Sequence, residues 1–240
     1  MTDLNEQPQA TEPIKAKPHP KHKGWVWAVI IIFVLLLVIG ATGLVSIPVI
    51  SSIFNMNKPK DLGIKASPEA LASIQAKVPV EIIGNSNELC LACKQTYDGQ
   101  IAVTAKRTSE EMTSFLQLFP RQEGDILKNT QVRFIEGGME ISTKLNKYIS
   151  APIYVKVMVN RTGTKTVDLR ITNGKVGLFN VPSKYLSQAN EFFTKLTNDH
   201  LAEVTGFSMD KLEYHAGYSD FSGTYPKTVK PSPGQWTDVF

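Results

Sequence analysis

A long stretch without charge near the N-terminus limits what this 240-residue chain can fold into more than any other feature. No charged residue occurs over residues 24–57, and the most apolar part runs from Trp25 to Val45 through Leu36. A helix of that length spans roughly 31 Å, against about 30 Å for the hydrocarbon core of a bilayer. The composition therefore predicts a single transmembrane helix over residues 24–47.

The flanks of this segment predict its orientation. Trp25 and Trp27 stand at its start, where indole rings favour the headgroup zone. The basic residues before the segment are Lys15, Lys17, Lys21 and Lys23, and none follows until Lys58. The positive-inside rule then places the N-terminus in the cytoplasm and the rest of the chain outside it. A cleaved signal peptide is the alternative, although the apolar run is long for one.

Composition divides the remainder of the chain. Residues 1–23 are rich in Pro, Lys, Gln and Glu without apolar periodicity, which predicts a disordered cytoplasmic tail. We expect residues 48–66 to be a linker and residues 67–225 to be an extracytoplasmic folded domain. The Pro-rich residues 226–240 are predicted to form a flexible tail.

Three helices are expected in the folded domain. Ser67-Pro68 has the pattern of an N-cap followed by proline at the first helical position. Thr108 and Glu111 have the spacing of a capping box. Apolar residues at steps of three and four predict a long helix over residues 182–204.

Alternation with a period of two predicts strands between these helices. It occurs over residues 101–105 and in two candidate hairpins, 132–145 and 153–171. Asn173-Gly174 has the composition of a turn, and residues 207–223 form a last strand region. This order predicts an α+β domain in which one antiparallel sheet packs on helices.

Cys90 and Cys93 are the only cysteines and form the one motif that invites a chemical interpretation. A C-x-x-C pair is compatible with a local disulfide, a redox couple or half of a zinc site. The chain has no second pair to complete a four-cysteine zinc site. An oxidising exterior favours the disulfide. A redox pair, idle thiols and an intermolecular bond remain open as alternatives.

No pattern predicts a catalytic residue, cofactor or metal site. The nucleophile elbow, the zinc-protease motif and the phosphate-binding loop are all absent from the sequence. His200 lies on the apolar stripe of the long helix, where a core or edge histidine is expected. The net charge of +4, from 26 basic and 22 acidic residues, is too balanced for a nucleic-acid surface.

Several short patterns occur along the chain in a characteristic order. They are Thr108-Ser109-Glu110-Glu111-Met112, Val132-Arg133-Phe134 with Gly138-Met139-Glu140-Ile141-Ser142, Gly177-Leu178-Phe179-Asn180-Val181-Pro182, and Met209-Asp210-Lys211-Leu212-Glu213-Tyr214 with Phe221-Ser222-Gly223. This order over residues 99–225 resembles the LmeA-like phospholipid-binding family of bacterial envelope proteins. The resemblance implies a curved sheet wrapped around a long helix, an apolar groove and a non-enzymatic role in holding lipid. Residues 67–98 depart from the family pattern.

An apolar groove of this kind would be lined by residues from the second hairpin and the long helix. These are Val155, Val157, Leu169, Ile171, Phe192, Phe193 and Leu196. The same side chains fit a closed core equally well. We therefore expect a membrane-anchored, extracytoplasmic domain that binds membrane lipid. The alternatives are an assembly module with a closed core that binds an envelope protein, and a thiol-disulfide redox protein.

Overall fold

The computed structural model describes residues 58–85, 95–119, 127–145 and 151–231. The chain divides into two compact units, 1–39 and 40–240, and every described residue belongs to the second. The predicted transmembrane helix and its markers Trp25, Trp27, Leu36 and Val45 lie outside the described residues. None of the helices within the described ranges is long and apolar enough to cross a membrane.

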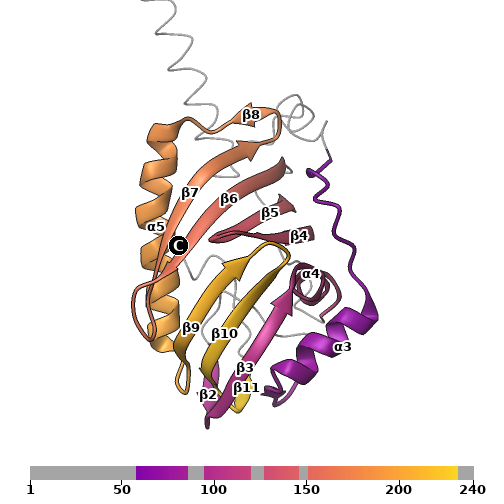
Figure 1. Ribbon diagram of the computed structural model, residues 1–240, viewed down its shortest axis with the longest axis vertical. Helices are drawn as coiled ribbons and strands as arrows, with labels where there is room; N and C mark the ends of the chain where they lie inside the picture. The colour runs from indigo at the N-terminus through magenta and orange to yellow at the C-terminus, as the bar shows by residue number, and fades with distance from the viewer. Residues whose placement is uncertain (1–57, 86–94, 120–126, 146–150, 232–240) are drawn as a thin grey trace, which may run out of the picture. The chain divides into compact units, whose positions relative to one another are not determined.

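The described part is a mixed α+β structure with three helices and mostly antiparallel sheets (Figure 1). The helices are α3 (Pro68–Lys77), α4 (Ser109–Leu118) and α5 (Ser183–Glu203). The strands are β1 (Glu81–Ile82), β2 (Thr96–Asp98), β3 (Ile101–Thr108), β4 (Leu127–Ile135), β5 (Gly138–Leu145), β6 (Ala151–Arg161), β7 (Val167–Val176), β8 (Phe179–Asn180), β9 (Ser208–His215), β10 (Tyr218–Tyr225) and β11 (Thr228–Lys230). The predicted α+β class is confirmed at this level.

The largest sheet has the strand order β4-β5-β6-β7-β8, and all its pairs are antiparallel. Both predicted hairpins are confirmed, as β4-β5 and β6-β7. The predicted turn at Asn173-Gly174 is wrong, because β7 continues through it to Val176. A Cβ on Gly174 would lie 3.1 Å from the Leu186 side chain of α5. The absence of a side chain at Gly174 therefore allows α5 to pack closely against this strand.

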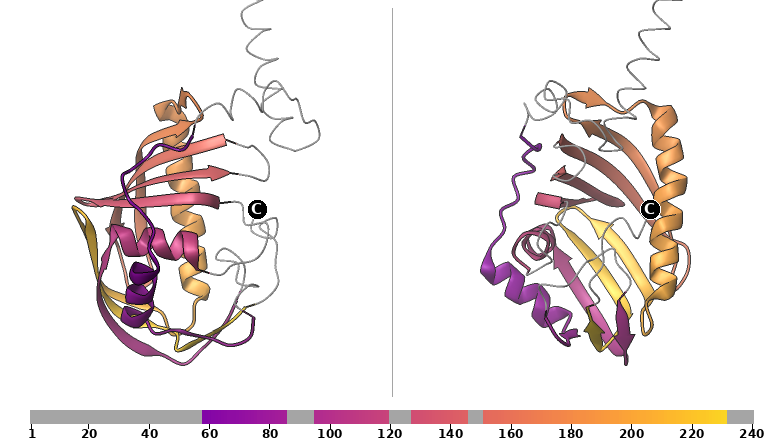
Figure 2. Two further views of the ribbon diagram at one scale, coloured as in Figure 1. Left: turned by 90° about the vertical axis from the view of Figure 1, so that its right-hand side faces the viewer. Right: turned by 180° about the vertical axis from the view of Figure 1, so that it is seen from behind.

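A second sheet has the order β3-β10-β9. Its two hairpin strands β9 and β10 replace the single strand region expected there. The pairing shifts between Ser222 and Gly223, and Gly223 has φ +153° where a Cβ would lie 2.1 Å from the Ser208 carbonyl oxygen. Gly137 N donates to Tyr214 O at 3.0 Å, which joins the second sheet to the β4-β5 turn. The strands of both sheets curve visibly in Figure 2.

A small third sheet has the order β1-β11-β2. Strand β11 pairs parallel with β1 and antiparallel with β2. The chain is therefore in regular structure beyond residue 225, where the flexible tail was expected to begin. The expected linker also contributes to packing, because Leu62 is 4% exposed and its N–H donates to Gln131 Oε1 at 2.6 Å.

The helix starts follow the sequence prediction. Ser67 accepts a hydrogen bond from Ala70 N, and Pro68 occupies the first turn of α3. Thr108 and Glu111 form the complete capping box of α4. Glu111 also accepts bonds from Ser73 Oγ at 2.5 Å and Lys77 Nζ at 2.6 Å. One buried carboxylate therefore caps α4 and ties it to α3.

Helix α5 lies along the outer edge of β7 (Figure 1), and none of its side chains is buried. Polar side chains four residues apart bond alternate backbone groups of the strand. The helix residues are Asn190, Thr194 and Asn198, and their strand partners are Ile171, Leu169 and Val167. Four helical residues advance about 6 Å and two strand residues about 6.7 Å, so the two repeats match. The helix therefore satisfies an edge that would otherwise be open to pairing.

Helix α4 caps the opposite edge of the same sheet in the same way. Its side chains at steps of four form hydrogen bonds with the backbone of β4. The helix runs antiparallel to this strand, as α5 does to β7. The helix residues are Ser109, Thr113 and Gln117, and their strand partners are Phe134, Val132 and Thr130. Thr113 is fully buried and both accepts from Val132 N at 2.9 Å and donates to Val132 O at 3.2 Å.

One cluster of buried apolar residues centres on the second sheet and includes Val167 of β7. It contains Val103, Ala105, Val167, Phe207, Met209 and Phe221. The alternation predicted from residue 101 is confirmed, with the side chains of Val103 and Ala105 turned inward. Leu201 of α5 and Val204, which follows the helix as its C-cap, are partly buried and pack against this cluster.

Candidate functional site

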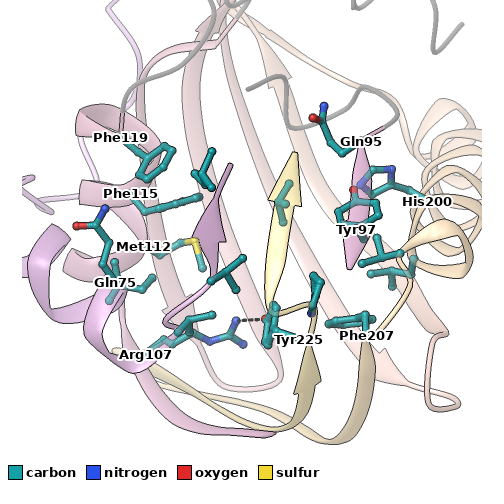
Figure 3. Close-up of a pocket in the computed structure, with 18 residues that line it drawn as sticks. Gln75, Gln95, Tyr97, Arg107, Met112, Phe115, Phe119, His200, Phe207 and Tyr225 are labelled. Atoms are coloured by element: carbon teal, nitrogen blue, oxygen red, sulfur yellow. Dashed lines mark hydrogen bonds between the residues drawn. The ribbon is translucent and has the colours of Figure 1, made fainter. Parts of the chain in front are cut away.

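A cavity of about 730 Å³ lies between α3, α4, the small third sheet and the C-terminal end of α5. Figure 3 shows Met112, Phe115 and Phe119 on one side of it, with Tyr97 and His200 on the other. Arg107 and Tyr225 lie at one end. Because β1, β2 and β11 contribute to its wall, the third sheet helps to define this space.

The walls are mostly apolar. The apolar lining residues are Ile74, Val78, Val80, Ile82, Met112, Phe115, Phe119, Leu201, Val204, Phe207, Pro226 and Val229. The others are Gln75, Gln95, Tyr97, Arg107, His200 and Tyr225. Such a lining, with a small number of polar groups, is typical of sites for small apolar ligands.

Helix α4 supplies the aromatic wall because its two faces have different roles. Its polar residues at steps of four form hydrogen bonds with the backbone of β4, as described above. Met112, Phe115 and Phe119 follow at steps of three and four, which places them together on another face of the helix. The rings of Phe115 and Phe119 are 5.0 Å apart between centroids. The sequence therefore builds one helix that closes the sheet and lines the cavity.

Among the described residues that line the cavity, Arg107 alone carries a permanent positive charge. It follows Val103 and Ala105 in the alternation of β3, so its side chain shares their inward face. Its Nη1 donates to Tyr225 Oη at 3.3 Å. Its guanidinium carbon lies 5.1 Å from the centroid of the Phe221 ring, within the range of a cation–π contact.

Burial changes the titration of two tyrosines in this region. Burial raises the pKa of Tyr97, and the negative charge of Glu203 raises it further. Burial raises the pKa of Tyr214 to about 12, although the positive charge of Arg107 opposes that rise. Both hydroxyls therefore stay protonated at neutral pH.

The residues predicted to line a groove do not line this cavity. Val155, Val157, Leu169 and Ile171 lie in β6 and β7, where Leu169 and Ile171 bond α5 through their backbone. Phe192 and Phe193 are 48% and 44% exposed, with ring centroids 5.3 Å apart. Leu196 is half-buried on α5. Cys90 and Cys93 lie outside the described residues.

Sequence reasoning missed Arg107 and Tyr225. The alternation read at residues 101–105 continues with the same parity to Arg107, which places a cation at an inward position. A charged residue at an inward strand position is the feature of the sequence from which Arg107 could have been identified. Tyr225 is the pairing partner of Ile101 on β10, and its inward position depends on a strand register that distant residues set.

Glu213, His215 and Asp220 form the one group of potential metal ligands among the described residues. Lys211 Nζ lies 3.0 Å from Glu213 Oε2 and 3.8 Å from Asp220 Oδ2. A hydrogen bond from Lys211 lowers the pKa of the exposed Glu213. The carboxylates are therefore neutralised by a lysine, and the group fits a surface ion-pair network.

Comparison with known proteins adds no relative to this description. No protein-family model matches the chain, and neither a curated protein nor a solved structure matches it.

Proposed function

We propose that this chain is a membrane-anchored protein whose folded domain, outside the cytoplasm, holds a lipid or similar apolar ligand in the cavity. The proposed role is non-enzymatic. The observation that carries it is the cavity of about 730 Å³ with mostly apolar walls. That volume lies inside the range of about 300–1,000 Å³ typical of small-molecule sites.

The walls favour an apolar occupant over water. Most of the lining residues are apolar. Water finds few hydrogen-bond partners on such walls. An apolar ligand is therefore the better occupant.

The sequence supports a ligand that comes from a membrane. The predicted helix over residues 24–47 would hold the cavity close to a bilayer, which is a source of lipid. The resemblance of residues 99–225 to the LmeA-like family implies the same ligand class. Both supports are predictions from sequence, independent of the cavity.

The alternative of an assembly module has less support. A closed core predicts no cavity of this size among the described residues. Binding through sheet edges is disfavoured at β4 and β7, because α4 and α5 already bond these edges. The redox alternative depends on Cys90 and Cys93, and it stays a prediction.

Photocrosslinking tests the lipid proposal. The full chain is reconstituted in phospholipid nanodiscs that contain a lipid with a diazirine in its acyl chain, irradiated, and digested for mass spectrometry. We expect crosslinks to cavity residues such as Met112 and Leu201. A Leu201→Trp variant should lose them, because the larger side chain occupies ligand space.

Leu178→Trp is the matched control, since Leu178 is 58% exposed and does not line the cavity. This variant should crosslink like the wild type. Crosslinks confined to residues 24–47, or cavity crosslinks that persist unchanged in Leu201→Trp, would show that the cavity does not hold lipid.

A further inference from the structure

No carboxylate among the described residues neutralises the charge of Arg107. Arg107 shares the inward face of the second sheet with Phe221 and Tyr225, as the β3-β10 register requires. Its side chain lies over the Phe221 ring and reaches Tyr225. The guanidinium therefore lies between the core and the cavity that it lines (Figure 3).

Few of its donors have partners. A guanidinium carries five N–H donors, and the bond to Tyr225 is the only hydrogen bond of this side chain within the described ranges. Arg107 Nε is buried without a hydrogen-bond partner there, and none of the described carboxylates forms a salt bridge with Arg107. The Phe221 contact offsets only part of the cost of removing the cation from water.

We propose that the cavity takes an amphiphile with an anionic head group, which Arg107 binds at the end of the cavity nearest Tyr225. Arginine matches carboxylate and phosphate oxygens through paired N–H donors. Tyr225 accepts the bond from Arg107, so its own hydroxyl proton is left to donate to the same anion. This inference rests on the proposed function and names its ligand class.

The charge of Arg107 also explains how the cavity would compete with a bilayer for the same lipid. The interior of a bilayer is as apolar as these walls, so an acyl chain gains little by leaving it. Affinity must therefore come from contacts that the bilayer does not offer. A half-buried guanidinium with no carboxylate partner among the described residues is such a contact for an anion.

The test compares two probes that differ only in the head group. The full chain in neutral phosphatidylcholine nanodiscs is titrated with palmitate or with 1-hexadecanol, each with a diazirine in the chain, and crosslinks to cavity residues are counted. In the wild type, palmitate should label the cavity at lower concentration. Arg107→Met should weaken palmitate labelling by about 10- to 100-fold, as expected for loss of a charged hydrogen bond, and leave hexadecanol labelling unchanged.

Two further arms make the result specific. Arg107→Lys, which keeps the charge but loses the paired donors, should weaken palmitate labelling less than Arg107→Met. Displacement by unlabelled palmitate or by lysophosphatidic acid identifies the carboxylate or the phosphate as the better head group. If Arg107→Met does not fold, Tyr225→Phe replaces it, and the ratio of the two probes in the wild type still tests the idea.

The outcomes separate this inference from the function that it rests on. Equal labelling by both probes in the wild type, or palmitate labelling that Arg107→Met leaves unchanged, would overturn the anionic head group alone. Absence of cavity labelling by either probe would overturn the lipid-binding function as well.

Discussion

The hydrogen bonds between α5 and β7 give the sharpest prediction for stability. The perturbation is the triple variant Asn190→Ala, Thr194→Ala and Asn198→Ala. It removes five hydrogen bonds: one from Ile171 N, two with Leu169 and two with Val167. The backbone groups of β7 that lose these partners are part-buried, so water replaces the partners poorly.

The magnitude follows from these bonds. At about 1 kcal/mol net for each hydrogen bond, the loss is about 5 kcal/mol. Alanine returns about 0.6 kcal/mol of helix propensity at each position, or about 2 kcal/mol in all. The free energy of unfolding should therefore fall by about 3 kcal/mol. For a domain of this size, the melting temperature should fall by about 6–12 °C.

Two measurements on the full chain in nanodiscs check this prediction. Circular dichroism follows thermal unfolding, and hydrogen exchange follows the β7 amides, which should exchange faster. The control replaces Gln188, Glu191 and Lys195 by alanine, because these three side chains are exposed on the same helix. The reasoning is refuted if the two triple variants unfold within about 1 kcal/mol of each other and β7 exchange is unchanged.

Further predictions concern charge and backbone conformation. Glu111→Gln should cost about 2 kcal/mol and exposed Glu110→Gln under about 0.5 kcal/mol in urea unfolding. Burial raises the pKa of Glu111, but bonds from Lys77 and others outweigh burial and lower it below 4.5. Its stabilisation is thus present above that pH and lost below it, and the melting temperature of Glu111→Gln should depend less on pH. Gly223→Ala should cost about 2–4 kcal/mol, because its Cβ meets Ser208 O, and Gly84→Ala only about 1 kcal/mol.

The capped edges explain how the large sheet remains closed to further strands. An open strand edge is a template for pairing with another chain. Here, side chains of α4 and α5 bond the free backbone groups of β4 and β7 over three alternate residues each. If the triple variant of α5 also associates at high concentration, the hydrogen bonds between α5 and β7 have a second role, which is to prevent edge pairing between chains.

The candidate site is less predictable than the elements that build it. The sequence predicted a groove between the second hairpin and α5, and Phe192 and Phe193 are exposed on that helix. The cavity described above lies against α3, α4 and the third sheet. Strands β1, β2 and β11 have two or three residues each. Segments this short have no detectable periodicity, so their sheet and the wall that it forms could not be predicted.

Local chemistry explains what the sequence by itself determined. The capping box of Thr108 and Glu111, the two large hairpins and the span of α5 were all predicted correctly, because each depends on residues close together along the chain. The α+β class follows from the order of those elements.

Only the tertiary structure decided which faces meet. The Asn173-Gly174 dipeptide has turn composition, yet it continues a strand because Leu186 packs against Gly174. Arg107 meets Tyr225 across 118 residues of sequence, and the cavity combines residues from Ile74 to Val229. Such contacts depend on strand register and helix position, which the burial of the whole domain sets. No local pattern specifies them.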